Sequence, residues 1–72
     1  MTLKQLQTLA RGSGYNVTKT DGEYRIAASL TRFSAYHPNA TRDELRTMIE
    51  DGAYYTTCID DAAATLRQLI GS

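Results

Sequence analysis

The sequence predicts a small α+β domain in which a three-stranded antiparallel sheet carries the two terminal helices on one face. Three observations support this fold class. Apolar residues recur at helical spacing near both ends, an Asp-Gly turn joins two alternating segments, and a short tyrosine-rich segment precedes the last helix. The order α-β-β-(α)-β-α is satisfied most simply by two layers in one domain spanning residues 1–72.

The first helix is predicted from Thr2 to Arg11. Thr2 is suited to cap it, and Gln5 stands at the third helical position, which completes a capping box. The Gly-Ser-Gly run at 12–14 ends the helix, because glycine accepts the left-handed conformation that a helix stop needs. The stripe expected to be buried consists of Leu3, Leu6, Leu9 and Ala10.

Two strands, Tyr15–Thr20 and Glu23–Leu30, are predicted to form a hairpin around Asp21-Gly22, a strong signal for a type I′ turn. This turn sets a register in which Thr20 pairs with Glu23. One face then carries Tyr15, Val17, Tyr24, Ile26 and Ala28. The other face carries Asn16, Thr18, Thr20, Glu23 and Arg25. This alternation predicts that one face packs on helices and the other faces water.

Residues 31–52 are predicted to be an insertion between the second and third strands. Its first part, residues 31–40, is expected to be irregular because of the Pro-Asn pair at 38–39. A short helix follows from Thr41 to Asp51, with a second capping box formed by Thr41 and Glu44 and with a glycine as its stop. This helix is expected to pack at a sheet edge or over the open end of the layer.

The third strand is predicted at Ala53–Thr56. Tyr54 and Tyr55 point to opposite faces of the sheet, so the pattern leaves open which of them faces inward. We expect Tyr54 to lie beside Arg25 on the outer face.

The last helix is predicted to begin near Cys58 with Thr57 as its cap. Asp60 and Asp61 stand in the first turn and Arg67 in the last turn, where the helix dipole favours their charges. The apolar positions 59, 62, 63, 66, 69 and 70 give this helix the clearest buried stripe in the chain.

The charges balance overall but are unevenly spread along the chain. Residues 1–40 hold five basic and two acidic side chains, a net charge of +3, whereas residues 41–72 hold three basic and six acidic ones, a net charge of −3. Strong nucleic-acid binders show a clear basic excess. A neutral total with this split favours a protein partner over a nucleic acid, or simply serves solubility.

The single cysteine excludes an intramolecular disulfide and indicates a reducing compartment, so we expect a cytoplasmic protein. No apolar run approaches the roughly 18 residues of a membrane span, and we expect no membrane partner.

Several short motifs resemble those of a group of small uncharacterised proteins of bacteria and their phages. They are Gly14-Tyr15, Asp21-Gly22-Glu23-Tyr24-Arg25, Ala53-Tyr54-Tyr55-Thr56 and the acidic helix start at Asp61-Ala62. The resemblance covers most of the chain except residues 31–50. Because that family carries no assigned activity, the resemblance implies an origin as a phage or prophage accessory protein rather than a chemistry.

The element order also resembles that of the double-stranded RNA-binding domain. That domain meets phosphates with a basic cluster at the start of its last helix, where this chain has Asp60 and Asp61. Two carboxylates there would repel a phosphate backbone. The resemblance therefore implies a shared topology without the RNA-binding surface.

No catalytic, metal or cofactor site is predicted. Cys58 could act as a nucleophile at a helix start with His37 as its base, but a small packed thiol and a loop histidine explain both residues more simply. One cysteine, one histidine and scattered carboxylates do not supply the ligands of a metal site. The glycines at 12–14 follow a helix rather than a strand, so they lack the context of a phosphate-binding loop.

A binding surface is expected where arginine and aromatic side chains are exposed, because these residue types form interface hot spots. The candidates are Arg25, Arg32, Phe33, Tyr36 and Tyr54. For Arg25, a position on an ordinary solvated sheet face is the simpler explanation. The leading hypothesis is a non-enzymatic protein-interaction module acting on a bacterial host protein. Nucleic-acid binding, a cysteine-dependent enzyme and a homodimer formed through an open sheet edge are the alternatives.

Overall fold

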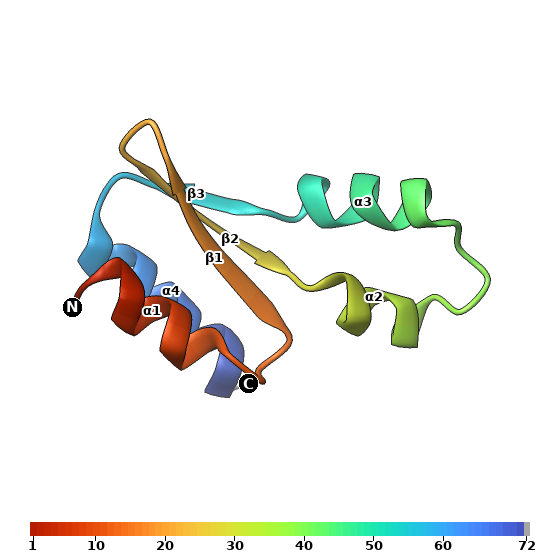
Figure 1. Cartoon of the computed structure of the whole chain (residues 1–72), viewed down its shortest axis with the longest axis horizontal. Helices are drawn as coiled ribbons and strands as arrows, with labels where there is room; N and C mark the ends of the chain where they lie inside the picture. The colour runs from red at the N-terminus through yellow and green to blue at the C-terminus, as the bar shows by residue number, and fades with distance from the viewer. Residues whose placement is uncertain (72) are drawn as a thin grey trace.

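The computed structural model describes residues 1–71, which form four helices and three strands. In chain order these are α1 (Leu3–Ala10), β1 (Tyr15–Thr20), β2 (Glu23–Ala28), α2 (Leu30–Tyr36), α3 (Arg42–Asp51), β3 (Tyr54–Thr56) and α4 (Ile59–Gly71). The strands form one sheet in the order β1-β2-β3 with both pairs antiparallel. α1 and α4 lie side by side against this sheet, which confirms the predicted fold class (Figure 1).

The segment between β2 and β3 forms an arm, defined here as residues 29–52, that contains α2 and α3. The two helices run back alongside each other and continue outward from the ends of β2 and β3 (Figure 1). They do not fold back over the face of the sheet: α3 contacts β2 and projects beyond the end of the layer (Figure 1). The arm gives the molecule its elongated shape, with extents of 37 × 25 × 17 Å.

The N-terminal helix and the hairpin follow the sequence prediction closely. The amide of Thr2 donates to Gln5 Oε1 at 2.8 Å and the amide of Gln5 donates to Thr2 Oγ1 at 3.2 Å, which is the expected capping box. Asp21 and Gly22 both have positive φ, 54° and 78°, as a type I′ turn requires. Thr20 pairs with Glu23, and the predicted register holds along both strands.

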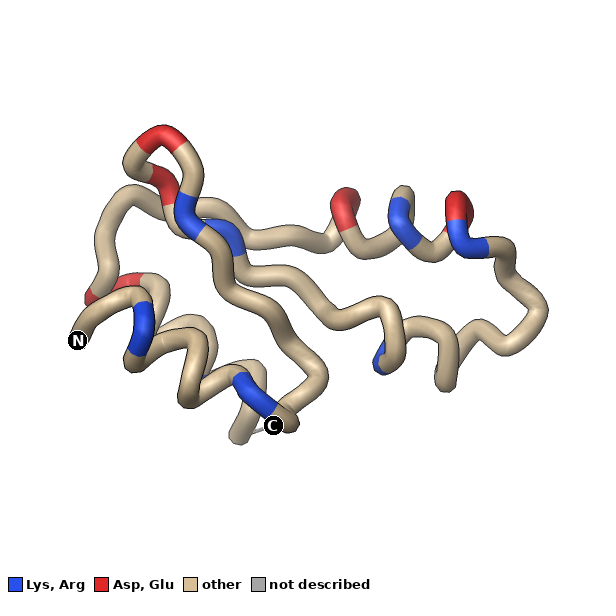
Figure 2. Tube along the Cα trace, viewed as in Figure 1, with Lys and Arg blue, Asp and Glu red and all other residues tan. Residues whose placement is uncertain are grey.

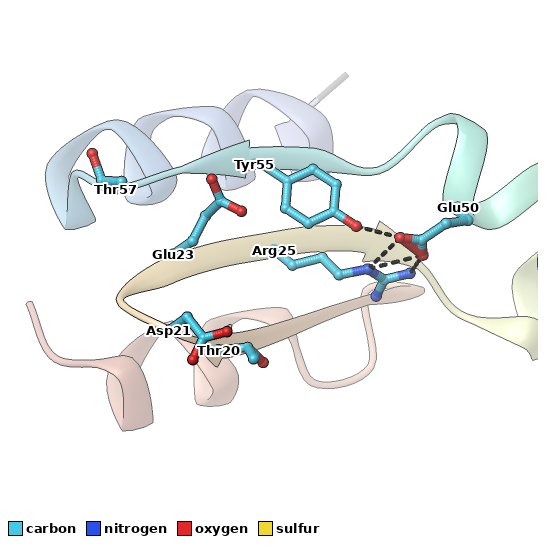
Figure 3. A pocket seen from close by; sticks show the side chains of 7 residues that line it. All are labelled: Thr20, Asp21, Glu23, Arg25, Glu50, Tyr55 and Thr57. Carbon is cyan, nitrogen blue, oxygen red and sulfur yellow. Dashed lines mark hydrogen bonds and ion pairs between the residues drawn. The ribbon is translucent and has the colours of Figure 1, made fainter.

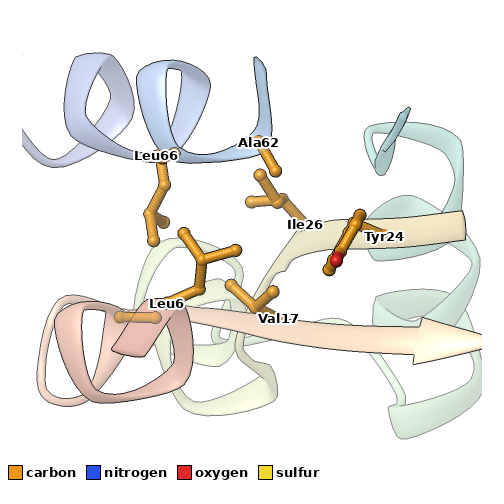
Figure 4. Close-up of a cluster of buried hydrophobic side chains, with 8 residues drawn as sticks. Leu6, Val17, Tyr24, Ile26, Ala62 and Leu66 are labelled. Atoms are coloured by element: carbon orange, nitrogen blue, oxygen red, sulfur yellow. The ribbon is translucent and has the colours of Figure 1, made fainter. Parts of the chain in front are cut away.

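The core lies between the two terminal helices and the inner face of the sheet (Figure 4). Leu6 of α1, Ile26 of β2 and Leu66 of α4 are its largest fully buried side chains. Burial of each such side chain contributes about 1.5–3 kcal/mol to the free energy of unfolding. The cluster consists of Leu6, Ala10, Val17, Tyr24, Ile26, Ala62, Ala63 and Leu66.

The free edge of β1 is partly covered. Gln7 of α1 donates through Nε2 to the carbonyl of Val17 at 3.1 Å. That carbonyl is therefore already hydrogen-bonded and cannot readily accept from an added strand. The opposite edge is β3, which has three residues. A blocked acceptor and a very short strand are both devices that limit pairing between sheet edges.

Residues 31–40 are more regular than predicted. Ser29 caps α2 by accepting a hydrogen bond at Oγ from the amide of Arg32 at 3.1 Å, so β2 ends at Ala28 and Leu30 begins a helix instead of ending a strand. Serine at this position accepts from one of the first helical amides, which have no carbonyl partner within the helix. The helix ends at Tyr36, because the residue before Pro38 is disfavoured in the helical conformation.

The start and end of α4 also differ from the prediction. The helix begins at Ile59, so the residue before it is Cys58 and not Thr57. The carbonyl of Cys58 accepts from the amide of Ala62 at 3.0 Å. Because the helix continues to Gly71, Arg67 lies before the last turn. Cys58 is exposed, so its interpretation as a packed hydrophobic side chain is wrong.

Candidate interaction groove

The pairing of β3 with β2 determines which face of the sheet carries Tyr54 and which carries Tyr55. Tyr55 lies opposite Arg25, and Tyr54 lies opposite Ile26. Because directly paired residues share a face of the sheet, Tyr55 belongs to the outer face with Arg25 and Tyr54 to the face that carries the helices. The predicted placement of Tyr54 beside Arg25 is therefore wrong.

On the outer face, Arg25, Glu50 and Tyr55 form one polar network (Figure 3). Arg25 donates to Glu50 Oε2 from Nη2 at 2.6 Å and from Nε at 3.2 Å, and the Tyr55 hydroxyl donates to Glu50 Oε1. These bonds from Arg25 and then Tyr55 hold the pKa of Glu50 below its ordinary 4.5. The carboxylate in turn raises the pKa of Arg25. Arg25 is thus engaged within the chain, where it joins the arm to the sheet.

The depression beside this network has an acidic lining and a volume of about 440 Å³. Asp21, Glu23 and Glu50 all line it, with Arg25 bound to the last of these carboxylates. Among residues 1–71, no group of three His, Cys, Asp or Glu side chains is placed to hold a metal ion.

On the other face of the sheet, a groove of about 390 Å³ lies between α4 and the base of the arm. We call it the interaction groove. Its lining is mostly apolar and aromatic, and Arg32 is the charged residue in it. The side chains that define it include Tyr15, Arg32, Phe33, Ile49, Tyr54 and Leu69.

Arg32 is held among aromatic rings at the rim of this groove. Its Cζ lies 5.0 Å from the centroid of the Tyr15 ring and 5.6 Å from that of Tyr36. Such cation–π contacts contribute about 0.5–1 kcal/mol each at exposed sites, and they orient the guanidinium. Tyr36 is 68% exposed, and it reaches the rim of the groove through its contact with Arg32.

Tyr54 connects the groove to the start of α4. Its hydroxyl donates to Asp61 Oδ2, and this bond raises the pKa of Tyr54 above 10.0 and lowers the pKa of Asp61 below 3.8. Asp61 therefore has a specific partner in addition to the favourable end of the helix dipole.

The structure brings together four of the five residues predicted for a binding surface. Arg32, Phe33 and Tyr54 line the groove, and Tyr36 stacks on Arg32 at its rim. Arg25 lies on the opposite face of the sheet. The sequence did not mark Ile49 and Leu69 as groove residues, because both belong to ordinary apolar helical stripes. Nothing in the pattern indicated that these two side chains line a groove instead of being fully buried.

The charge split along the chain does not become a charge split in space. Basic and acidic residues alternate along α3 and around the β1–β2 turn (Figure 2). The Arg25–Glu50 ion pair also joins the basic half of the chain to the acidic half. In this view the basic positions are spread over α1, the β1–β2 hairpin, α2 and α3, whereas nucleic-acid binders gather such residues on one face or element (Figure 2).

The proposed cysteine–histidine pair is not brought together. His37 follows α2 as its C-cap and its ring packs at a tilt on Phe33, with ring centroids 5.7 Å apart, whereas Cys58 precedes α4. The end of α2 and the start of α4 lie at opposite ends of the molecule (Figure 1). Within residues 1–71, no helix is both long and apolar enough to cross a bilayer.

Comparison with family models, with curated proteins and with solved structures finds no match to this chain. The groove, the network and the distribution of charge are therefore the observations from which a function can be proposed.

Proposed function

We propose that this chain is a non-enzymatic protein-interaction module that binds its partner in the interaction groove. The observation that carries the proposal is the composition of that groove. It combines Phe33, Tyr15 and Tyr54 with an arginine whose position is fixed by stacking. Aromatic residues and arginine dominate the hot spots of protein interfaces, above all where they form a pocket.

The size of the groove suits a small group of partner side chains. Ligand pockets occupy about 300–1,000 Å³, and this groove, at about 390 Å³, stands near the lower limit. One or two apolar side chains of a partner segment fit this space better than a large cofactor. Arg32 is the charged residue of the lining, so the segment should carry a neutral or negative group at that end.

We further propose that the module is a phage or prophage accessory protein that acts on a bacterial host protein in the cytoplasm. The support for this part is the resemblance of the 21–25 hairpin and the 53–56 strand to small phage and bacterial proteins. The single cysteine, which is exposed, is compatible with a reducing compartment.

The test is capture of a partner from bacterial lysate by the tagged chain, with half of the sample treated with nuclease. Thr65 lines the groove on α4, and its neighbour Ala64 is exposed and does not line it. We expect Thr65→Arg to lose the captured protein, because a long charged side chain fills the groove. Ala64→Arg adds the same charge to the same helix and should retain the partner.

Two results would contradict the proposal. The first is loss of the captured material on nuclease treatment, which would favour the nucleic-acid alternative. The second is equal capture by the two arginine variants when their thermal midpoints match that of the wild type, because the groove would then not be the binding surface.

A further inference from the structure

A third hollow lies between the loop that follows α1 and the start of α2. We call it the loop pocket; its volume is about 510 Å³. It lies beside the interaction groove, and Tyr15 and Arg32 line both. The lining that matters for its chemistry consists of Arg11, Gly12–Gly14, Ser29, Thr31 and Arg32. We propose that this pocket binds a phosphate monoester group.

The charge of the lining is the first argument. Arg11 and Arg32 contribute two guanidinium groups, and no carboxylate lines the pocket. Among residues 1–71, the ion pair that forms is Arg25–Glu50. Neither Arg11 nor Arg32 is therefore neutralised by a carboxylate of the described chain. The hydroxyls of Ser13, Ser29 and Thr31 and the side-chain amide of Asn16 add neutral polar groups to the lining. Two arginines match the charge of a phosphate dianion and can donate in pairs to its oxygens.

The second argument is that Arg32 is held in place before any ligand arrives. The rings of Tyr15 and Tyr36 lie 5.0 and 5.6 Å from its Cζ. Among residues 1–71 the Arg32 guanidinium makes these ring contacts but no hydrogen bond or ion pair, so its N–H donors remain available. Little conformational freedom then remains to be lost when an anion binds.

The third argument is the close packing of the loop on this arginine. A Cβ at Gly14 would lie 2.9 Å from Arg32 Cδ, and the glycine also has a φ of 90°. Glycine is therefore required both for the backbone conformation and for the approach of the side chain. The amide of Ser29 donates to the carbonyl of Gly14 at 2.7 Å, which joins the loop to the beginning of the arm.

The isolation of the pocket favours a monoester over a nucleic-acid backbone. Binding to nucleic acid usually neutralises several phosphates in a row with a basic surface. The other basic residues here are spread over several elements and alternate with acidic ones on α3 and around the β1–β2 turn (Figure 2). A single site with two arginines fits one terminal phosphate, as on a phosphorylated metabolite or a phosphorylated side chain.

This inference goes beyond the protein-interaction proposal and does not depend on it. The isolated chain can be titrated with small anions whether or not a protein partner exists. A failure of the titration therefore leaves the capture experiment to be decided by its own result.

The experiment is an NMR titration of the ¹⁵N-labelled chain with inorganic phosphate, with O-phosphoserine and with a single-stranded oligonucleotide that has no terminal phosphate. We expect saturable shifts of the Gly12, Ser13 and Gly14 amides with the first two ligands and weaker effects with the third. Arg32→Gln should weaken phosphate binding by about tenfold or more, because it removes charge-assisted hydrogen bonds.

Two further variants keep the test decisive. Arg11 is exposed outside α1, so Arg11→Gln removes the second cation without touching the core and should also weaken binding. Arg46→Gln removes an exposed arginine of α3 that does not line the pocket, and it should bind phosphate as the wild type does. Absence of saturable shifts, equal weakening by Arg46→Gln, or tighter binding of the oligonucleotide than of O-phosphoserine would overturn the proposal.

Discussion

Arg25 on β2 binds the carboxylate of Glu50 near the end of α3, with Nη2 and Oε2 2.6 Å apart. The two residues are 25 positions apart in the chain, so this contact is a tertiary one that joins the sheet to the arm. Tyr55 of β3 donates to the same carboxylate. The network therefore helps to set the angle at which the arm leaves the sheet, and with it the position of the groove residues that the arm carries.

This network should make the stability of the chain depend on pH. The pKa of Glu50 is lowered from 4.5, chiefly by the hydrogen bond from Arg25. A carboxylate whose pKa is lower in the folded state contributes stability that is complete above its unfolded pKa and is lost as the pH falls through its folded pKa. We expect Glu50→Gln to lower the urea midpoint at neutral pH, and the difference from the wild type to shrink as the pH falls below 4.5 and through the lower folded pKa of Glu50. A difference that stays constant in acid would exclude ionised Glu50 as its source.

Truncation of the core should unfold the chain. Leu66 is fully buried, and Leu66→Ala should cost about 2–5 kcal/mol. After the entropy cost of folding, the net stability of a chain of this size is rarely more than about 3–5 kcal/mol, so circular dichroism should show a largely unfolded variant at room temperature. Ile70 lies on the same helix and is 38% exposed, so Ile70→Ala should stay folded. A folded Leu66→Ala chain with an unchanged thermal midpoint would contradict the assignment of the core.

The hairpin turn should tolerate a side chain poorly. Gly22 has a φ of 78°, where an L-residue costs about 1–2 kcal/mol, and we expect Gly22→Ala to lose about that much stability in urea unfolding. Gly52 is the control, because its φ is −95° and an added Cβ would meet its nearest neighbour at an ordinary 3.7 Å. Gly52→Ala should therefore be neutral or slightly stabilising. Equal losses for the two variants would argue against the type I′ turn.

The cap of α3 offers a way to loosen the arm alone. Thr41 Oγ1 accepts from the amide of Glu44 at 3.2 Å, and Thr41→Ala should cost this helix about 1 kcal/mol. Hydrogen exchange should then become severalfold faster for the amides of α3 and remain unchanged for those of β1 and β2. Faster exchange throughout the chain would mean that the arm and the sheet open as one unit.

Local signals made much of the fold predictable. The turn at 21–22 and the alternation beside it determine the register, because a shift by one residue would turn every apolar side chain of the hairpin to the wrong face. Both capping boxes formed as predicted, since each needs only two residues three positions apart.

The failures arose where distant contacts decide the outcome. β3 has three residues, and alternation cannot orient Tyr54 and Tyr55 when the two side chains are alike. Tyr54 bonds to Asp61 on α4 and Tyr55 to Glu50 on α3. These partners come near the tyrosines only in the folded chain, so the sequence pattern does not reveal the orientation of the two rings. The loop pocket was missed for the same reason, because the glycine loop gains Arg32 from another element.

The arm contributes no side chain to the main buried cluster, and it leaves and re-enters the sheet through two adjacent strands. A short turn between β2 and β3 could take its place while the main buried cluster, which draws on α1, β1, β2 and α4, keeps all its members. Evolution can therefore lengthen, trim or replace residues 29–52 while the folding unit persists, and each replacement would rebuild one wall of the groove. Homologues of this chain should accordingly diverge most in the arm, and with it change what they recognise.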